Sequence, residues 1–199
     1  MREIIATARC YECGKAMEGK KGEYKYVESG LNSVFLKDIL VFRCTNCSAV
    51  VPEIPAAGKL HWVIARRLLS KKTLLAGSEL RFLRKLCGYS VDEFSEIMGS
   101  TRDVVYRWES KNAHGKGAHG KGTDRTVRLL VFNNFLAKLL SNDQPKLMPK
   151  NVTAEQLQAE VQKALKEIVR KHVSERYDIF PEEFAGLDHG PEGELAAVH

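Results

Sequence analysis

The chain has 199 residues, 44% hydrophobic and 28% charged, a composition that predicts one or two globular domains with a buried core. It contains no apolar run near the roughly 18 residues of a membrane helix and no apolar secretory signal, so we expect a cytoplasmic protein without a membrane partner. The net charge of +6 is concentrated in residues 59–140, which carry 16 Lys and Arg against 7 Asp and Glu, whereas residues 141–199 carry 7 against 11. A basic central segment favours a polyanionic partner.

Two cysteine pairs lie in the N-terminal quarter of the chain. Cys10 and Cys13 form one C-x2-C motif, and Cys44 and Cys47 form the other. Two residues between cysteines let both thiolates face one ion, so the two pairs predict a closed four-thiolate site suited to structural Zn²⁺. Closely paired cysteines in a cytoplasmic chain favour metal binding over disulfides. An iron site of rubredoxin type and a pair of redox dithiols are the alternatives.

The spacer between the cysteine pairs predicts a β-hairpin. Residues 22–28 and 34–44 have strand-like alternation, and residues 29–32 form the turn. Folding the hairpin back brings the cysteines together, so we expect residues 1–55 to form a small zinc-binding domain that depends on its metal. Gly14 follows the first pair, where a left-handed turn fits, and Ser48 holds the same place after the second.

Pro52 and Pro55 mark the end of this domain. A helix is predicted from about residue 57 to residue 70, and residues 56–74 are assigned to a linker helix. Its apolar side consists of Leu60, Val63, Ile64 and Leu68. The side chains expected in solvent are His61, Arg66 and Lys71. Cys87, the fifth cysteine, is interpreted as a small buried apolar residue.

Residues 75–141 predict an all-α domain that contains two short helices joined by a tight turn. Ser90 and Glu93 form a capping box that starts the first of the two, and Gly99 suits the left-handed residue that ends it. Its buried stripe is expected to be Phe94, Ile97 and Met98. In the second helix, Val104, Val105 and Trp108 form the apolar side, which leaves polar residues facing outward. This arrangement favours a helix-turn-helix that reads DNA, with two packed surface helices as the alternative.

The outward face of the second helix supplies the candidate DNA contacts. They are Thr101, Arg102, Asp103, Tyr106, Arg107 and Lys111. Arg107 is the first candidate for reading a base, because a bidentate arginine on guanine is the commonest specific contact. The alternative is a surface arginine paired with Asp103 one turn earlier.

The repeat HGKG-A-HGKG follows in residues 114–122. We interpret it as a solvated loop, with a phosphate contact or a loose metal site as alternatives. Asp124 is then expected to cap a helix that ends near residue 140. That helix is apolar over a wide arc, which favours two packing partners, one of them a second copy of the chain. A homodimer would present two reading helices to a palindromic operator.

Residues 142–199 form an acidic tail. Thr153 and Gln156 have the form of a capping box, and the helix that follows carries an apolar stripe of Leu157, Val161, Ala164, Leu165 and Ile168. This stripe must be covered by the partner subunit, by the helical domain or by another protein. A short apolar patch follows at Ile179, Phe180 and Phe184, and the polar end is expected to be disordered.

The segments CYECG, ESGLNSVFLKDILVFRCTNC, ELRFLRKLCGYS and VVYRWES together resemble the MqsA-like proteins over roughly residues 8–140. These proteins join a YgiT-type zinc finger to an Xre/Cro-type helix-turn-helix. The resemblance implies that the four paired cysteines bind zinc, that Arg107 reads a base and that the helical domain dimerises. In some members of that family the zinc domain holds a ribonuclease toxin, and the helical domain represses the member's own operon. Other members resemble plain regulators.

Two aspartates depart from this family pattern, and the tail lies outside the resemblance. Asp103 stands where a neutral amide or small polar residue usually reads a base, and Asp92 stands where many Xre-type domains place a phosphate-contacting glutamine. Phosphates repel carboxylates, although an aspartate can accept a hydrogen bond from cytosine. The operator of this chain is therefore expected to differ from those of its relatives.

Taken together, the sequence predicts an α+β protein with a four-cysteine β-hairpin domain, a helix-turn-helix domain and a C-terminal amphipathic helix. The predicted function is sequence-specific transcriptional regulation by a dimeric autorepressor, with the antitoxin of a toxin–antitoxin pair as one form of it. The alternative is a protein-interaction adaptor that uses the zinc domain and the C-terminal helix. An enzyme is not expected, because the sequence has no nucleophile–base pairing, phosphate-binding glycine loop or open metal site.

Overall fold

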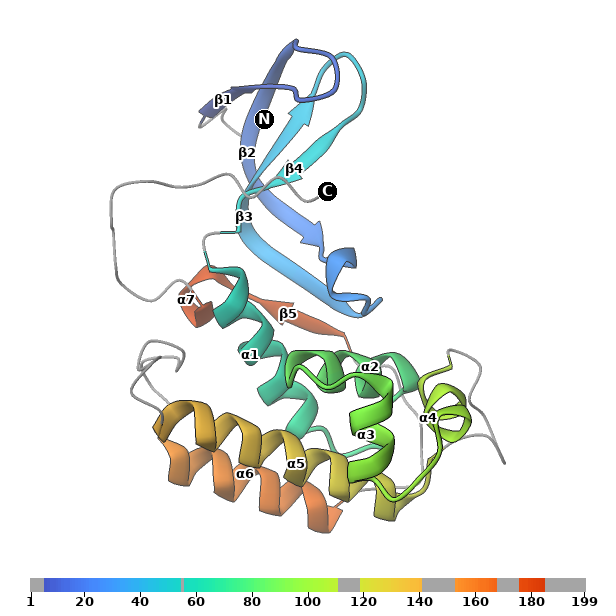
Figure 1. Cartoon of the computed structure of the whole chain (residues 1–199). Coiled ribbons are helices and arrows are strands. Elements are labelled where there is room, and N and C mark those ends of the chain that lie inside the picture. The colour runs from blue at the N-terminus through green and yellow to red at the C-terminus, as the bar shows by residue number, and fades with distance from the viewer. Residues whose placement is uncertain (1–5, 55, 111–118, 141–152, 168–175, 185–199) are drawn as a thin grey trace.

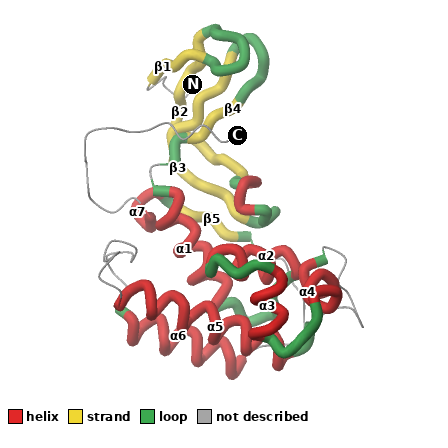
Figure 2. The backbone as a smooth tube through the Cα atoms, viewed as in Figure 1, coloured by secondary structure: helices red, strands yellow, loops and turns green. Residues whose placement is uncertain are grey.

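The computed structural model describes residues 6–54, 56–110, 119–140, 153–167 and 176–184 (Figure 1). A sheet occupies one end of the molecule and helices the other (Figure 2), which confirms the mixed α+β class. The strands are β1 (Ala6–Arg9), β2 (Ala16–Lys25), β3 (Val34–Cys44), β4 (Val50–Pro52) and β5 (Tyr177–Ile179). The helices are η1 (Val27–Ser29), α1 (Ala57–Leu69), α2 (Gly77–Leu86), α3 (Val91–Ile97), α4 (Arg102–Glu109), α5 (Lys121–Leu140), α6 (Ala154–Glu167) and α7 (Pro181–Phe184).

The predicted β-hairpin is present and forms the centre of the sheet. Its strands β2 and β3 pair antiparallel, from Met17 opposite Cys44 to Lys25 opposite Phe35. β2 is longer than predicted, because it continues back to Ala16 and also pairs with β1. β4 pairs antiparallel with the second half of β3. The β1–β2 and β3–β4 turns, at which the cysteine pairs lie, are at the end of the sheet away from the helices (Figure 1).

The tail contributes a strand that the sequence does not predict. β5 pairs parallel with the first residues of β3, with Val34 opposite Tyr177 and Leu36 opposite Ile179. Ile179 and Phe184 are buried within the chain, whereas Phe180 is exposed. A strand of three residues is too short to give a recognisable period of two. The polar end of the tail, residues 185–199, lies outside the described residues.

Helix α1 lies in a single hydrophobic core that joins the sheet to the helices. Its predicted apolar side is buried, and so are Trp62, Ala65 and Leu69. Leu36 and Ile39 of β3 belong to the same core. The Tyr26 hydroxyl lies 2.8 Å from Nε2 of His61, which links the hairpin to α1. Helix α1, which lies within the predicted linker of residues 56–74, thus contributes buried residues to this core. His61 is half-buried rather than solvated.

Two polar residues have different environments from those predicted. Lys71 is not solvated, because its Nζ lies 2.8 Å from Glu79 Oε2 and both side chains are buried. Asp124 is not the cap of α5, which begins at Lys121. The carboxylate of Asp124 instead accepts hydrogen bonds from the Leu75 N–H and from Arg128 Nε, both at 2.7 Å. Leu75 lies 49 residues away in sequence, so local sequence spacing could not reveal this contact.

Arg128 is fully buried and closes the end of α1. Its guanidinium donates hydrogen bonds to Asp124 and also, at 2.7 to 3.0 Å, to four backbone carbonyls, those of Leu68, Leu69, Lys71 and Thr73. The last carbonyls of a helix have no partner within the helix. Arg128 supplies those partners and fixes α5 to the α1–α2 connection.

His119, the second histidine of the HGKG repeat, lies next to Asp124 in this buried network. His119 is buried, and its Nε2 lies 3.4 Å from Oδ2 of Asp124. Its side chain is therefore not part of a solvated loop, contrary to the sequence interpretation. The end of the predicted loop is helical, because Lys121 and Gly122 begin α5. Residues 112–118 of the loop lie outside the described part of the chain.

The wide apolar arc of α5 finds its partners within the chain. α6 lies alongside α5 (Figure 1), and the capping box of α6 is confirmed by reciprocal hydrogen bonds between Thr153 and Gln156. Residues of both helices are buried, namely Val127, Val131, Phe132 and Phe135 of α5 and Leu157, Val161 and Ala164 of α6. The arc therefore does not require a second copy of the chain.

Gly77 marks a close approach between the start of α2 and the end of α4. A Cβ at this position would lie 2.5 Å from the Ser110 carbonyl oxygen and 2.7 Å from that of Trp108. We therefore expect Gly77→Ala to lower the free energy of unfolding by about 1–3 kcal/mol in urea denaturation, because backbone must move.

Gly58 in α1 provides the matched control, since a Cβ there would meet no atom within 4 Å. We expect Gly58→Ala to leave the free energy of unfolding unchanged or to raise it by up to about 1 kcal/mol. Equal losses for the two substitutions would contradict a specific contact at Gly77.

Candidate metal centre and exposed helical surface

The four paired cysteines converge at one end of the sheet. Sγ of Cys10 lies 3.4 Å from Sγ of Cys47, and Sγ of Cys13 lies 3.5 Å from Sγ of Cys44. All four sulfur atoms lie within 4.8 Å of one another. In a tetrahedral site with metal–sulfur bonds of about 2.3 Å, the sulfur atoms are about 3.8 Å apart. The cluster therefore fits one metal ion, and its four soft donors suit zinc or iron.

Left-handed residues shape the turn after each cysteine pair. Gly14 has φ of 69° and Ser48 has φ of 63°, as the sequence predicts for these positions. The Gly14 N–H donates to the Cys10 carbonyl at 2.9 Å, and the Asn46 N–H points at Sγ of Cys44 at 3.4 Å. These turns aim backbone N–H groups and thiols at a common centre, as a metal knuckle requires.

Backbone hydrogen bonds prepare the cluster for a cation. The N–H groups of Asn46 and Cys47 lower the pKa of the Cys44 thiol to about 6, because they favour the thiolate. The Ala49 N–H also lowers the pKa of Cys47, but hydrogen bonds with Cys10 and neighbouring thiols outweigh it and raise this pKa to about 12. Without metal, the cluster shares protons among its sulfur atoms. A bound cation replaces those protons.

The packing around the cysteines is thin. Within the described residues, the buried members of this second apolar cluster are Cys10, Met17 and Cys44, and Phe42, Ala49 and Val51 pack against them in part. So few side chains cannot hold a folded end of a sheet by themselves. A metal with four thiolate ligands has no open position for substrate or water, so its role here would be structural.

Helices α3 and α4 form a two-helix unit with the predicted local signals. Both hydrogen bonds of the Ser90–Glu93 capping box are present, and Gly99 has φ of 57° after the end of α3. Thr101 precedes α4 in extended conformation, without a side-chain cap. One predicted buried residue is wrong, because Ile97 at the last turn of α3 is 46% exposed.

A buried ion pair fixes α4 on α2. Arg84 Nε donates to Glu109 Oε1 at 2.6 Å, and Nη2 donates to Oε2 at 3.0 Å. Both side chains are buried. A bidentate pair restricts orientation as well as distance. The position of α4 is thus set by this pair together with the close approach at Gly77.

The outward face of α4 carries five of the six predicted DNA contacts. Thr101, Arg102, Asp103, Tyr106 and Arg107 are exposed, while Val105 of the same helix is buried. Lys111 lies outside the described residues. Arg107 forms no ion pair with Asp103 or another described residue, so the alternative of a paired surface arginine is not observed there.

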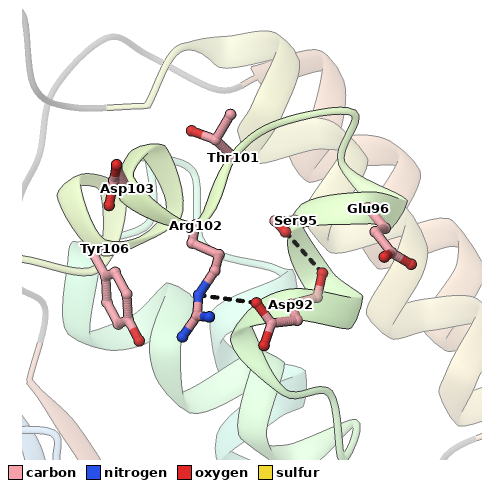
Figure 3. Close-up of a pocket in the computed structure, with 7 residues that line it drawn as sticks. All are labelled: Asp92, Ser95, Glu96, Thr101, Arg102, Asp103 and Tyr106. Carbon is pink, nitrogen blue, oxygen red and sulfur yellow. Dashed lines mark hydrogen bonds and ion pairs between the residues drawn. The ribbon is translucent and has the colours of Figure 1, made fainter.

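An open groove lies between α3 and the first half of α4 (Figure 3). Three carboxylates line it, from Asp92, Glu96 and Asp103, together with Arg102 and Tyr106. Arg102 Nε donates to Asp92 Oδ1 at 2.9 Å. This pair was not predicted from the sequence. The available signal was opposite charge at the starts of two neighbouring helices, which does not determine whether the side chains meet.

Comparison with protein-family models, curated proteins and solved structures found no match for the chain. In the described part of the chain, no helix combines the length and apolar character needed to span a membrane. The functional assignment therefore rests on the chain's own residues and their geometry.

Proposed function

We propose that the chain is a sequence-specific DNA-binding transcriptional regulator in which a structural Zn²⁺ holds the outer end of the sheet. The observation that carries this proposal is the exposed face of α4, where Arg102, Tyr106 and Arg107 project from a firmly held helix. An α-helix fits the major groove of B-DNA, and residues near its N-terminus reach the base edges. The unit of α3, Gly99 and α4 would then act as a helix-turn-helix.

Arg107 is the side chain that we expect to read a base. Its guanidinium is exposed and has no ion-pair partner among the described residues, so its planar donors remain available for guanine O6 and N7. Asp103 is exposed beside it and could accept from a cytosine amino group. A guanine and a cytosine at neighbouring positions are therefore the expected features of the operator.

The further parts of the proposal concern partners. We propose a cytoplasmic homodimer that binds a palindromic operator and represses its own gene, as the resemblance to MqsA-like proteins suggests. A ribonuclease toxin is a further partner if the chain acts as an antitoxin. Because α6 covers the arc of α5, the dimer contact would have to use another surface, such as that around the exposed Leu129.

A protein-interaction adaptor is the second candidate, and one observation favours it. Tyr11 lies between the first two cysteines and is 73% exposed, which is unusual for a large aromatic side chain and typical of a contact residue. On the other surface of that hypothesis, the stripe of α6, Leu157, Val161 and Ala164 are buried within the chain. Ile168 of the predicted stripe lies outside the described residues. The adaptor would therefore have to work through the cysteine end alone.

Selection of DNA from a random pool, followed by affinity measurement at several salt concentrations, tests the regulator. We expect one enriched sequence, whose affinity falls linearly with salt on a logarithmic plot. Arg107→Ala should weaken binding to that sequence by about 1–3 kcal/mol and relax the preference at one position. Arg43→Ala, which removes an exposed arginine from β3, is the matched control and should change neither property. A pool without enrichment would contradict the regulator and favour the adaptor.

A further inference from the structure

The ion pair between Asp92 and Arg102 crosses the groove between α3 and α4 (Figure 3). The Arg102 and Asp92 side chains are 60% and 59% exposed, and Nε lies 2.9 Å from Oδ1. The neighbouring Tyr106 hydroxyl and the charge of Asp92 both raise the pKa of the guanidinium. Exposed ion pairs contribute little to stability. The fold therefore does not need this pair, although the pair determines where the Arg102 charge lies.

The charge around Arg102 is unfavourable for a polyanion. Glu96 and Asp103 line the same groove as Asp92, so the groove contains three carboxylates and one guanidinium. Like charges repel, and this groove lies within the surface that would face DNA in the proposed function. Arg102, the cation at the start of α4, already forms an ion pair with Asp92 of the same chain.

We propose that Asp92 is a positioning residue. Its carboxylate pairs with Arg102 in the place that a DNA phosphate would otherwise take. The inference rests on the proposed function. A DNA phosphate that approaches Arg102 must compete with the Asp92 carboxylate for its positive charge, so that contact adds little to the affinity for an arbitrary sequence. Binding then depends on the base edges that Arg107 and Asp103 meet. Asp92 thereby lowers the affinity for DNA of other sequences and raises the ratio of specific to non-specific affinity.

Two effects of Asp92 can be separated by substitution. The carboxylate repels phosphates through its own charge, and it also occupies the Arg102 guanidinium. Asp92→Asn removes both effects, whereas the same substitution in an Arg102→Gln background removes the repulsion alone. A double-mutant cycle on DNA affinity therefore isolates the contribution of the pair.

The test compares a random-sequence duplex with the duplex selected by the native chain. We expect Asp92→Asn to raise affinity for the random duplex about five- to tenfold at low salt and to steepen its salt dependence by about one phosphate contact. Affinity for the selected duplex should rise less, so the specificity ratio falls. In the Arg102→Gln background the gain should shrink to about twofold or less.

Glu96→Gln is the matched control, because Glu96 lines the same groove and forms no ion pair among the described residues. It should raise affinity for the random duplex by about twofold at most, through loss of general repulsion. If Asp92→Asn behaves like Glu96→Gln, or gains equally in both Arg102 backgrounds, Asp92 does not position Arg102. That result leaves the regulator intact, whereas failure of the native chain to select any sequence overturns both proposals.

Discussion

Removal of the proposed metal is expected to unfold the outer end of the sheet while the helices remain folded. The packing near the cysteines is limited to a small cluster around Cys10, Met17 and Cys44. The other end of the same hairpin is different, because Val34, Leu36 and Ile39 belong to the main core with α1. Structural zinc supplies about 10–16 kcal/mol of apparent binding free energy in zinc-finger peptides. Loss of such a contribution should therefore act on one end of β2 and β3 and not on the other.

Hydrogen exchange with and without a chelator measures this difference along the hairpin. The amides expected to lose protection include that of Cys10, bonded to the Lys15 carbonyl, and that of Cys44, bonded to the Ala49 carbonyl. The Tyr26 amide, bonded to the Val34 carbonyl, should keep its protection. Exchange that accelerates equally at both ends would mean that the metal holds the whole fold. Unchanged exchange at the cysteine end would mean that no structural metal is there.

Single cysteine substitutions provide the matched control for metal content. Cys44→Ser removes one ligand, and we expect the purified variant to lose its bound ion. Cys87→Ala removes a buried cysteine at the end of α2, away from the cluster, and should keep the ion. Elemental analysis of the native chain should give one zinc per chain, whereas a rubredoxin-type iron site would absorb visible light. Retention of metal by Cys44→Ser would contradict a four-thiolate site.

The sequence predicted those features whose causes are local. The capping boxes at Ser90 and Thr153 need a residue and its partner three positions later, and both form as expected. The left-handed turn at Gly99 depends on one residue type, and the hairpin of β2 and β3 depends on alternation along each strand. The cysteine cluster was predictable as well, because two C-x2-C motifs joined by a hairpin can meet at a single centre.

The features that escaped prediction depend on contacts between distant segments. β5 joins β3 across more than a hundred residues, and three residues carry too little pattern to show it. Lys71 has the sequence context of a surface lysine, and only the fold places Glu79 against it inside the core. The ion pair in the groove was not predictable for the same reason. Asp92 and Arg102 pair only because the turn after α3 brings the starts of two helices together. Charge type was visible in the sequence, but tertiary placement decided burial and partner.

Arg128→Met is expected to destabilise the chain more than Gly77→Ala or any substitution of an exposed helical residue. The substitution keeps much of the side-chain volume but removes the charge that pairs with Asp124 at 2.7 Å in a fully buried setting. It also removes the hydrogen bonds that Arg128 donates to the carbonyls of Leu68 and Leu69. Breaking a buried pair from one side costs about 3–5 kcal/mol, because the other charge stays buried. Urea denaturation should show a loss of that size.

Arg125→Met is the matched control on the same helix. Arg125 is exposed and donates to the Leu165 carbonyl, so its loss should change the free energy of unfolding by no more than about 0.5 kcal/mol. Asp124→Asn added to Arg128→Met removes the stranded carboxylate and should recover part of the lost stability. If Arg128→Met and Arg125→Met unfolded alike, the buried network would not hold the end of α1.

The pH dependence of the Arg128→Met effect gives an independent check with a definite sign. Burial alone would raise the pKa of Asp124, but the hydrogen bond from His119 and the charge of Arg128 outweigh it and lower that pKa. In the native chain the contribution of Asp124 is therefore present above the unfolded pKa of about 3.9 and is lost as the pH falls through the lower folded value. Without Arg128, two of the interactions that lower this pKa are lost while the burial that raises it remains, so the folded pKa of Asp124 should rise. The carboxylate of the variant then contributes less stability at neutral pH than that of the native chain, and both contributions vanish in acid, so the stability gap between the two should narrow as the pH falls.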